Sequence, residues 1–267
     1  MSYAKRLTPP GLVSSLAVAA GAVILAFIVL PLWQMVTTPS LGSLWETIQD
    51  KEVLDSILLS AGTSFGAALI CLVLGTPLAY LLARHDFPGK RLAESILDLP
   101  IMIPHPVVGI ALLTLAGRGH AIGDLLQSLG VQVMGTVTGI VTVCTYVGLP
   151  FFLSTAKAGF ENVPLRLEKV SRSLGATPGA TFFRVTMPLA WRHMLAGTIM
   201  AAARAVSEFG AIVIVAYHPR IAPVLMYERF TAYGLKYSQP VAVWLILVCL
   251  GLFLLLRLVS LPRRALS

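Results

Sequence analysis

The stretch DSILLSAGTSFGAALICLVLGTPLAYLLAR occupies residues 55–84, and no charged side chain interrupts it between Asp55 and Arg84. A helix of this length exceeds the roughly 30 Å of hydrocarbon in a bilayer. So long an apolar run is typical of a membrane span and not of a soluble core. The stretch therefore predicts a membrane-spanning helix and an all-α membrane protein.

The composition of the whole chain agrees with this stretch. Of 267 residues, 57% are apolar and 12% are charged, whereas soluble proteins carry about 25% charged residues. This difference excludes a water-soluble enzyme. The length suits six membrane helices with their loops and leaves no room for a large soluble domain. The net charge of +8 is explained by a cytoplasmic excess of Lys and Arg, so no nucleic-acid partner is expected.

The intervals between charges predict six transmembrane helices in a single domain, residues 1–267. The basic start and the Ala17–Ala19 stretch resemble a secretory signal with a cleavage site. Cleavage there would leave an unusually short apolar core, so the first run is interpreted as a retained span. The predicted spans are residues 11–36, 55–84, about 92–118, about 135–157, 193–217 and 236–257.

Basic side chains set the orientation of these spans. With the N-terminus inside, the inner segments hold fourteen Lys and Arg residues, the outer segments hold five, and Arg204 lies within the membrane. Because cytoplasmic loops collect basic residues, both termini are predicted to be cytoplasmic. The expected location is the cytoplasmic membrane, crossed several times.

Signatures of catalysis are missing from the sequence. There is no Gly-x-x-x-x-Gly-Lys-Ser/Thr loop, so this chain is not expected to hydrolyse ATP. The five histidines lie on different segments, and no His-Glu-x-x-His pair occurs. Cys71, Cys144 and Cys249 lie in apolar runs and are interpreted as core residues. No enzyme activity, metal site or cofactor is expected in this chain.

The longest inner segment, residues 157–192, predicts an elbow of two short helices. Pro164 fits a first helical position, and Gly175 fits a left-handed cap at the end of the first helix. Thr177 can cap a second helix that starts at Pro178 and is expected to end at Pro188. The first helix carries an apolar stripe with basic flanks, made of Leu167, Val170 and Leu174, with Arg166, Lys169, Arg172 and Ser173 largely off it. The pattern fits either a helix lying flat in the headgroups or a docking surface for a soluble partner.

The elbow resembles the cytoplasmic motif of ABC importer permeases. That family carries Glu-Ala-Ala, three residues, Gly, nine residues and Ile-x-Leu-Pro. Here Lys169-Val-Ser171 stands at the first element, Gly175 at the glycine and Val185-Thr-Met-Pro188 at the last, with Glu168 one position early. The resemblance implies that the elbow docks on an ATPase subunit through a coupling set, namely Glu168, Lys169, Arg172, Gly175, Thr177 and Pro188.

Other stretches resemble the oxyanion branch of that family, and the molybdate/tungstate type most. They are residues 87–91, 97–111, 207–211 (Ser-Glu-Phe-Gly-Ala) and 222–230. The resemblance implies a type I importer permease that homodimerises, with two ATP-binding subunits on the cytoplasmic side and an extracytoplasmic oxyanion-binding protein. A sulfate or thiosulfate permease remains an alternative, as does an ion-coupled transporter.

Two intramembrane features are candidates for the pathway or gate. Pro104 and Pro106 flank His105, which predicts a break in the third span and a new helix whose N-terminus lies in the membrane. Transporters use such broken helices, although the prolines could equally serve packing alone. Arg204 and Glu208 are four residues apart, so one helical face would pair them near mid-bilayer, either as a structural pair or as a gate. The candidate residues are Pro104, His105, Pro106, Arg204, Ser207, Glu208, Phe209 and Gly210.

Overall fold

The computed structural model describes the backbone of residues 12–260, and the side chains of residues 15–251 and 254. Within this part of the chain all regular secondary structure is helical, which confirms the all-α class. Lys5, Arg6, Gly11, Arg263 and Arg264, which entered the predictions of span and orientation, lie outside the described residues.

The long helices follow the predicted spans, and short helices connect them. The first half of the described chain contains α1 (Leu12–Thr37), α2 (Leu41–Gln49), α3 (Lys51–Arg84), α4 (Lys90–Met102), α5 (His105–Ala116) and α6 (Ala121–Ser128). The second half contains α7 (Val137–Glu161), α8 (Leu165–Ser173), α9 (Pro178–Thr181), a π-helical turn η1 (Phe182–Thr186), α10 (Met187–Val206), α11 (Ile212–Val215), α12 (Ala222–Tyr233) and α13 (Leu235–Ser260).

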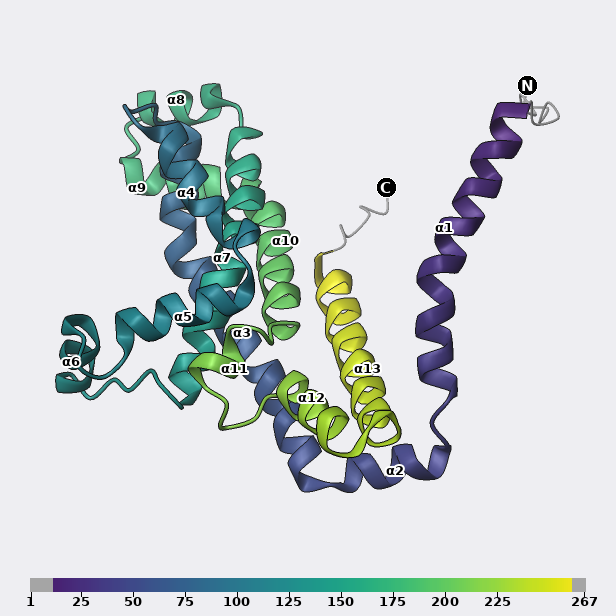
Figure 1. The fold of residues 1–267 in the computed structure, drawn as a ribbon. Helices are drawn as coiled ribbons and strands as arrows, with labels where there is room; N and C mark the ends of the chain where they lie inside the picture. Colours follow the sequence, from purple (N-terminus) through teal and green to yellow (C-terminus); the bar gives the residue numbers. More distant parts are fainter. Residues whose placement is uncertain (1–11, 261–267) are drawn as a thin grey trace.

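The arrangement has two opposite ends (Figure 1). The start of α1, the end of α13 and the elbow of α8 and α9 lie toward one end, at the top of the view. Helices α2 and α12 lie at the other end. Helices α1, α3, α7, α10 and α13 run along the direction between the two ends, whereas α5 points sideways toward α6.

Membrane-spanning character is clearest for three helices. Residues Ser15–Thr37 of α1, helix α3 and helix α7 are each long and apolar enough to cross a bilayer. Helices α4 and α5 qualify together, although they are bent by 113° at the break between them. Residues Leu235–Gly251 of α13 form a shorter apolar stretch. The count of six crossings stays a prediction.

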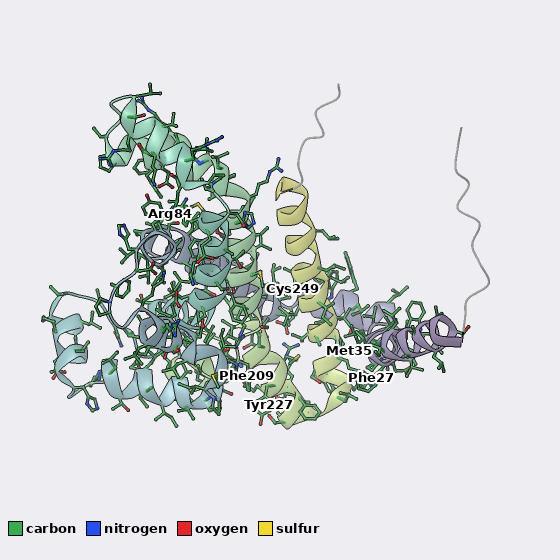
Figure 2. The ribbon with its side chains drawn as sticks, turned by 90° about the horizontal axis from the view of Figure 1, so that it is seen from above. Phe27, Met35, Arg84, Phe209, Tyr227 and Cys249 are labelled. Carbon is green, nitrogen blue, oxygen red and sulfur yellow. The ribbon has the colours of Figure 1, made fainter. Side chains whose placement is uncertain are left out.

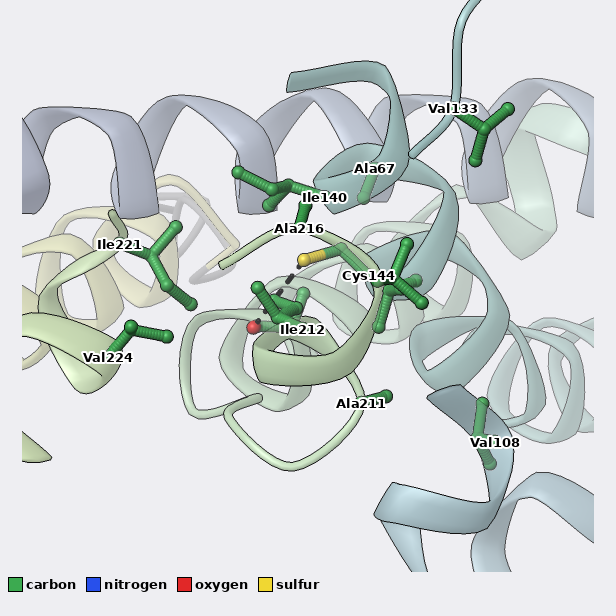
Figure 3. Close-up of a cluster of buried hydrophobic side chains, with 13 residues drawn as sticks. Ala67, Val108, Val133, Ile140, Cys144, Ala211, Ile212, Ala216, Ile221 and Val224 are labelled. Atoms are coloured by element: carbon green, nitrogen blue, oxygen red, sulfur yellow. Dashed lines mark hydrogen bonds between the residues drawn. The ribbon is translucent and has the colours of Figure 1, made fainter. Parts of the chain in front are cut away.

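The core forms where α3, α7 and α10 pack together. Phe152 of α7 is fully buried, and a Cβ at Gly75 of α3 would lie 2.6 Å from its ring, so glycine allows the two helices to approach. A second cluster joins α7 to α11 (Figure 3), where Cys144 and Ile212 are buried and the Cys144 thiol lies 3.7 Å from the Ala205 carbonyl oxygen. The burial of Cys71 and Cys144 confirms their prediction as core residues.

Helix α1 stands apart from this core. Within the described residues, none of its membrane-length apolar window is buried, and Phe27 and Met35 lie away from the central helices (Figure 2). An apolar helix that stands outside the core of its own chain must be covered by lipid or by another chain.

Candidate functional site

Two helix breaks lie opposite each other in the middle of the structure. The predicted break in the third span is confirmed: α4 ends at Met102, Ile103 is extended, and α5 begins at His105. The fifth span is also broken, since α10 stops at Val206 and α11 begins at Ile212. The prediction of one continuous helix over residues 193–217 was therefore wrong. The physical reason lies in the contacts that the residues between α10 and α11 make with the start of α5.

Arg204 is the centre of the contacts between the two breaks. Its Nη2 lies 2.7 Å from Glu208 Oε2 and 2.6 Å from His105 Nε2, and its Nη1 donates to Ser207 Oγ at 3.3 Å. Because a guanidinium only donates, the His105 nitrogen that it contacts must accept. The other ring nitrogen, His105 Nδ1, lies 3.0 Å from the same Arg204 Nη2 and 3.4 Å from Glu208 Oε2, so the imidazole contacts both members of the pair. The sequence predicted the Arg204–Glu208 pair but not the histidine as its third member.

Glu208 is the most deeply buried of these groups, with 1% of its side chain exposed. Its Oε1 accepts a hydrogen bond from the Ala211 backbone N–H at 2.9 Å, at the start of α11. The carboxylate thus holds Arg204 with one oxygen and the next helix with the other. Each oxygen of the buried carboxylate therefore has a hydrogen-bond partner in the protein and does not need water.

The remaining pathway candidates surround this cluster. A Cβ added at Gly210 would lie 3.0 Å from His105 Cβ and 3.2 Å from Pro106 Cδ, so the loop after α10 passes directly over the start of α5. Pro104 is the residue before α5. The Phe209 ring lies 5.0 Å from that of Tyr227 on α12, and Figure 2 shows these two side chains together. All eight candidates predicted from the sequence therefore lie at or beside the two breaks.

The small residues of α10 divide between two sides of the helix. Gly197 and Ala201 lie against α7, where a Cβ on Gly197 would come 3.0 Å from the Phe152 carbonyl oxygen. Ala202 and Ala203 instead line an apolar cleft of about 550 Å³ between α3, α10 and α13. This second side of α10 therefore lines a cleft and does not pack against α7.

The elbow has the predicted turn. Gly175 has a φ of +89°, Gly175 N–H bonds to the Arg172 carbonyl at 3.0 Å, and Ala176 N–H bonds to the Ser171 carbonyl at 3.1 Å. This is a Schellman cap, which requires the left-handed conformation that glycine adopts without strain. Thr177 Oγ1 accepts from Ala180 N–H at 3.2 Å and caps α9, as predicted.

The end of the elbow differs from the prediction. The second helix was expected to stop at Pro188, but α9, η1 and α10 form one continuous helical run through that proline. The π-helical turn explains this, because Met187 N–H bonds to the Phe182 carbonyl five residues back. The wider turn accommodates the missing N–H of Pro188 in the first turn of α10.

The coupling candidates divide into two sets. Lys169 and Arg172 are exposed, and Leu174 has 82% of its surface exposed. Glu168 points inward, where Arg84 of α3 and Thr186 of η1 both donate to its Oε1. Glu168 is therefore bonded within the chain, whereas Lys169 and Arg172 are exposed.

An ion-pair network at the opposite end was not predicted from the sequence. Arg229 of α12 binds Asp50 at 2.5 Å, while Arg220 binds Glu52 at 2.9 Å and Glu228 at 3.0 Å. From the sequence, segment 222–230 shows only a resemblance to oxyanion permeases. The available signal for the network is the Glu228-Arg229 pair together with the acidic residues at the start of α3. Among the described residues, no group of three or more His, Cys, Asp or Glu side chains could hold a metal ion.

These features define a class of protein: a helical membrane permease with two broken helices at its centre and an elbow whose outer face is free. A family model described as "Binding-protein-dependent transport system inner membrane component" matches residues 75–263, and the chain belongs to that family of ABC transporter permeases. It is a non-catalytic subunit located in the cytoplasmic membrane.

Several curated relatives resemble almost the whole chain. The "Molybdate/tungstate transport system permease protein WtpB" of Methanocaldococcus jannaschii is 41% identical over 235 residues, which cover 88% of this chain and 92% of the relative. The protein of the same name from Pyrococcus furiosus is 42% identical over 239 residues, 89% of this chain and 91% of the relative. A "Sulfate transport system permease protein CysT" of Synechococcus elongatus is 34% identical over 197 residues, 72% and 71% of the two chains.

Solved structures support the fold. A chain of a bacterial ABC transporter that imports the acidic polysaccharide alginate superposes with a TM-score of 0.74 at 16% identity, covering 96% of both chains. A chain of the MetNI methionine ABC transporter superposes with a TM-score of 0.63 at 15% identity, covering 83% of this chain and 97% of that one. The predicted type I importer permease fold is thereby confirmed.

Proposed function

We propose that this chain is the permease subunit of an ATP-driven importer that moves molybdate or tungstate into the cell by alternating access. The observation that carries the proposal is the identity of about 40% to molybdate/tungstate permeases along nearly the full length of both chains. Both anions are tetrahedral and doubly charged, so the pathway must offer positive charge without trapping the anion.

The cluster at the two helix breaks suits this task. Arg204 supplies a positive charge in the membrane, and Glu208 and His105 hold that charge when no anion is present. Because Glu208 balances Arg204, the cluster neither repels an oxyanion nor binds it irreversibly. Ser207, Phe209 and Gly210 form the loop that would move with the gate.

The exposed face of the elbow suits a soluble ATPase partner. Leu174, Val170 and Phe183 are exposed apolar side chains, and Lys169 and Arg172 flank them. A helix that presents such a stripe binds in a groove of its partner. ATP hydrolysis then belongs to two separate subunits, one for each permease.

A second copy of this chain would complete the permease. Helix α1 exposes its apolar side chains, and the cleft of about 550 Å³ leaves one face of α10 and α13 open. A homodimer would cover the cleft and place two Arg204 clusters around a common path. An extracytoplasmic oxyanion-binding protein would dock at the opposite end, beside α2 and α12.

One alternative is supported by an observation. Sulfate permeases resemble the chain at 34% identity over 72% of its length, and sulfate has the same shape and charge as molybdate. An ion-coupled transporter, the other alternative, would not need the elbow.

The test uses proteoliposomes that contain the permease with its ATPase and binding protein. Uptake of molybdate and tungstate is measured by mass spectrometry with and without internal ATP, and with a tenfold excess of sulfate. ATP-dependent uptake that sulfate does not reduce supports the proposal. Competition by sulfate favours the sulfate alternative, and uptake without ATP but with an ion gradient favours a secondary transporter.

A further inference from the structure

The Glu168 carboxylate joins three helical elements at the base of the elbow. Its Oε1 lies 2.7 Å from Arg84 Nη2, 3.0 Å from Arg84 Nε and 2.9 Å from Thr186 Oγ1. Its Oε2 lies 3.5 Å from the Tyr80 hydroxyl. Only 13% of the Glu168 side chain is exposed, so these contacts leave little of it for a partner protein.

Arg84 fixes the other half of this contact. It is the last residue of α3, its side chain is 6% exposed, and it lies beside the elbow in Figure 2. Besides Glu168, its Nη2 donates to the Val163 carbonyl at 2.9 Å. The end of α3 thus binds both the connection that enters the elbow and the first elbow helix.

Thr186 binds Glu168 from the end of the elbow that leads into α10. It is fully buried at the end of η1, directly before α10. Ser171 of α8 and Thr181 of α9 add a hydroxyl–hydroxyl bond of 3.0 Å between the two arms. Because α8 and α9 are hydrogen-bonded to each other and the turn between them at Gly175 is capped, the elbow is a rigid body.

Two long helices lead away from this contact. Helix α10 continues from η1 to Arg204 at the helix breaks. Helix α3 has 34 residues, about 50 Å at 1.5 Å per residue, and reaches the opposite end, where Asp50 at its N-cap binds Arg229 of α12. Helix α3 is therefore ion-paired at both ends.

From these contacts we infer that Glu168 is a positioning residue that acts through Arg84 and Thr186, and not a contact to the ATPase. The Glu168–Arg84–Thr186 cluster, here called the joint, passes a displacement of the elbow to α3 and α10 together. This inference rests on the proposed function. It assigns ATPase contact to the exposed Lys169 and Arg172, and transmission to the joint.

The experiment compares Glu168→Gln, Arg84→Gln and the double variant in reconstituted complexes. We measure anion uptake, ATP hydrolysis stimulated by the loaded binding protein, and the amount of ATPase that co-purifies. Uptake per ATP hydrolysed should fall about fivefold or more in each single variant, with co-purification unchanged. The double variant should lose no more than the worse single variant, because the two residues act through one contact.

The control variants distinguish transmission through the joint from a loss of docking and from the loss of an arbitrary ion pair. Glu94→Gln removes the ion pair between Glu94 and Lys157, which joins α4 to α7 outside the elbow, and should leave the ratio of uptake to hydrolysis unchanged. Lys169→Gln with Arg172→Gln should reduce co-purification instead. The double variant, Glu168→Gln with Arg84→Gln, leaves no unpaired charge. Uptake per ATP hydrolysed can therefore be measured in it even if a single variant folds poorly.

Three outcomes would overturn the inference: unchanged uptake per ATP in both single variants, loss of co-purified ATPase in Glu168→Gln, or additive losses in the double variant. Absence of ATP-driven uptake in the unmodified complex would instead reject the proposed function. The two failures are thereby distinguishable.

Discussion

Arg204 and Glu208 meet across the end of a helix: Arg204 Nη2 lies 2.7 Å from Glu208 Oε2, although α10 stops at Val206 between them. The pair therefore holds the turn that leaves α10, and Glu208 also binds the following segment through the N–H of Ala211. A pair within one helix would fix only that helix, whereas this pair fixes the direction of the chain between α10 and α11.

Removing one partner of this pair should destabilise the protein. In Arg204→Ala the carboxylate of Glu208, 1% exposed, loses its charged partner, at a cost of about 3–5 kcal/mol by comparison with soluble proteins. The measurement is the thermal unfolding temperature in detergent. An unchanged unfolding temperature would show that the pairing contributes nothing to stability.

The matched double variant separates this loss of stability from an effect on gating. Arg204→Leu with Glu208→Gln removes both charges and keeps an amide oxygen that can accept from Ala211 N–H. We expect it to recover the thermal stability of the unmodified protein but not its uptake, with ATP hydrolysis no longer stimulated by the binding protein. Uptake at the unmodified rate would exclude the pair from the gate.

Gly210→Ala should impair transport more than stability. Its Cβ would lie 3.0 Å from His105 Cβ and 3.2 Å from Pro106 Cδ, tighter than ordinary van der Waals contact, so the loop after α10 would be pushed from the start of α5. Anion uptake is the readout. Gly62→Ala on α3, where an added Cβ meets nothing within 4 Å, is the control and should transport normally.

Gly175→Val should weaken docking of the ATPase. The φ of +89° is strained for a β-branched residue, by about 1–2 kcal/mol for the left-handed conformation, so the Schellman cap would open. Less ATPase should co-purify while the membrane helices stay folded. Gly179→Ala in α9 needs no unusual backbone and has open space at its Cβ, so its co-purification should be unchanged. Equal yields for both variants would contradict the role of the turn.

Features set by neighbouring residues were predictable from the sequence. Gly175 and Thr177 follow from local rules of helix capping, and the break at Pro104 follows from proline geometry. The long spans follow from the intervals between charges. Each of these depends only on residues close in the chain.

Contacts between distant segments were not predictable in the same way. Glu168 and Arg84 are 84 positions apart, and His105 and Arg204 are 99 apart, so no periodicity connects them. The end of α10 at Val206 also depends on a contact that only the fold creates: Glu208 accepts from the Ala211 N–H and holds the chain in a turn.

The predicted topology can be tested with reporter fusions. The excess of basic residues on the inner segments, and the position of the elbow at the same end as the start of α1 and the end of α13, lead us to expect both termini in the cytoplasm. Fusions after Arg118 and Arg220 should report the outside, and fusions after Lys90 and Arg172 the inside. An outside signal at Arg172 would contradict the docking proposal as well.

The end of α3 that begins at Asp50 should weaken in acid. Burial alone would raise the pKa of Asp50, but the hydrogen bond from Arg229 and the backbone N–H groups of Glu52 and Val53 outweigh it, so the pKa lies below its ordinary 3.8. A lowered pKa stabilises the fold above pH 3.8, and this contribution disappears as the pH falls through the folded-state value. Asp50→Asn should therefore unfold at a lower temperature than the unmodified protein at neutral pH, and the difference should shrink as the pH falls below 3.8. Asp55→Asn, at the same end of α3 but exposed, is the control, and its unfolding temperature at neutral pH should stay close to that of the unmodified protein. A constant difference between Asp50→Asn and the unmodified protein across this range would show that the charge of Asp50 does not hold α3 to α12.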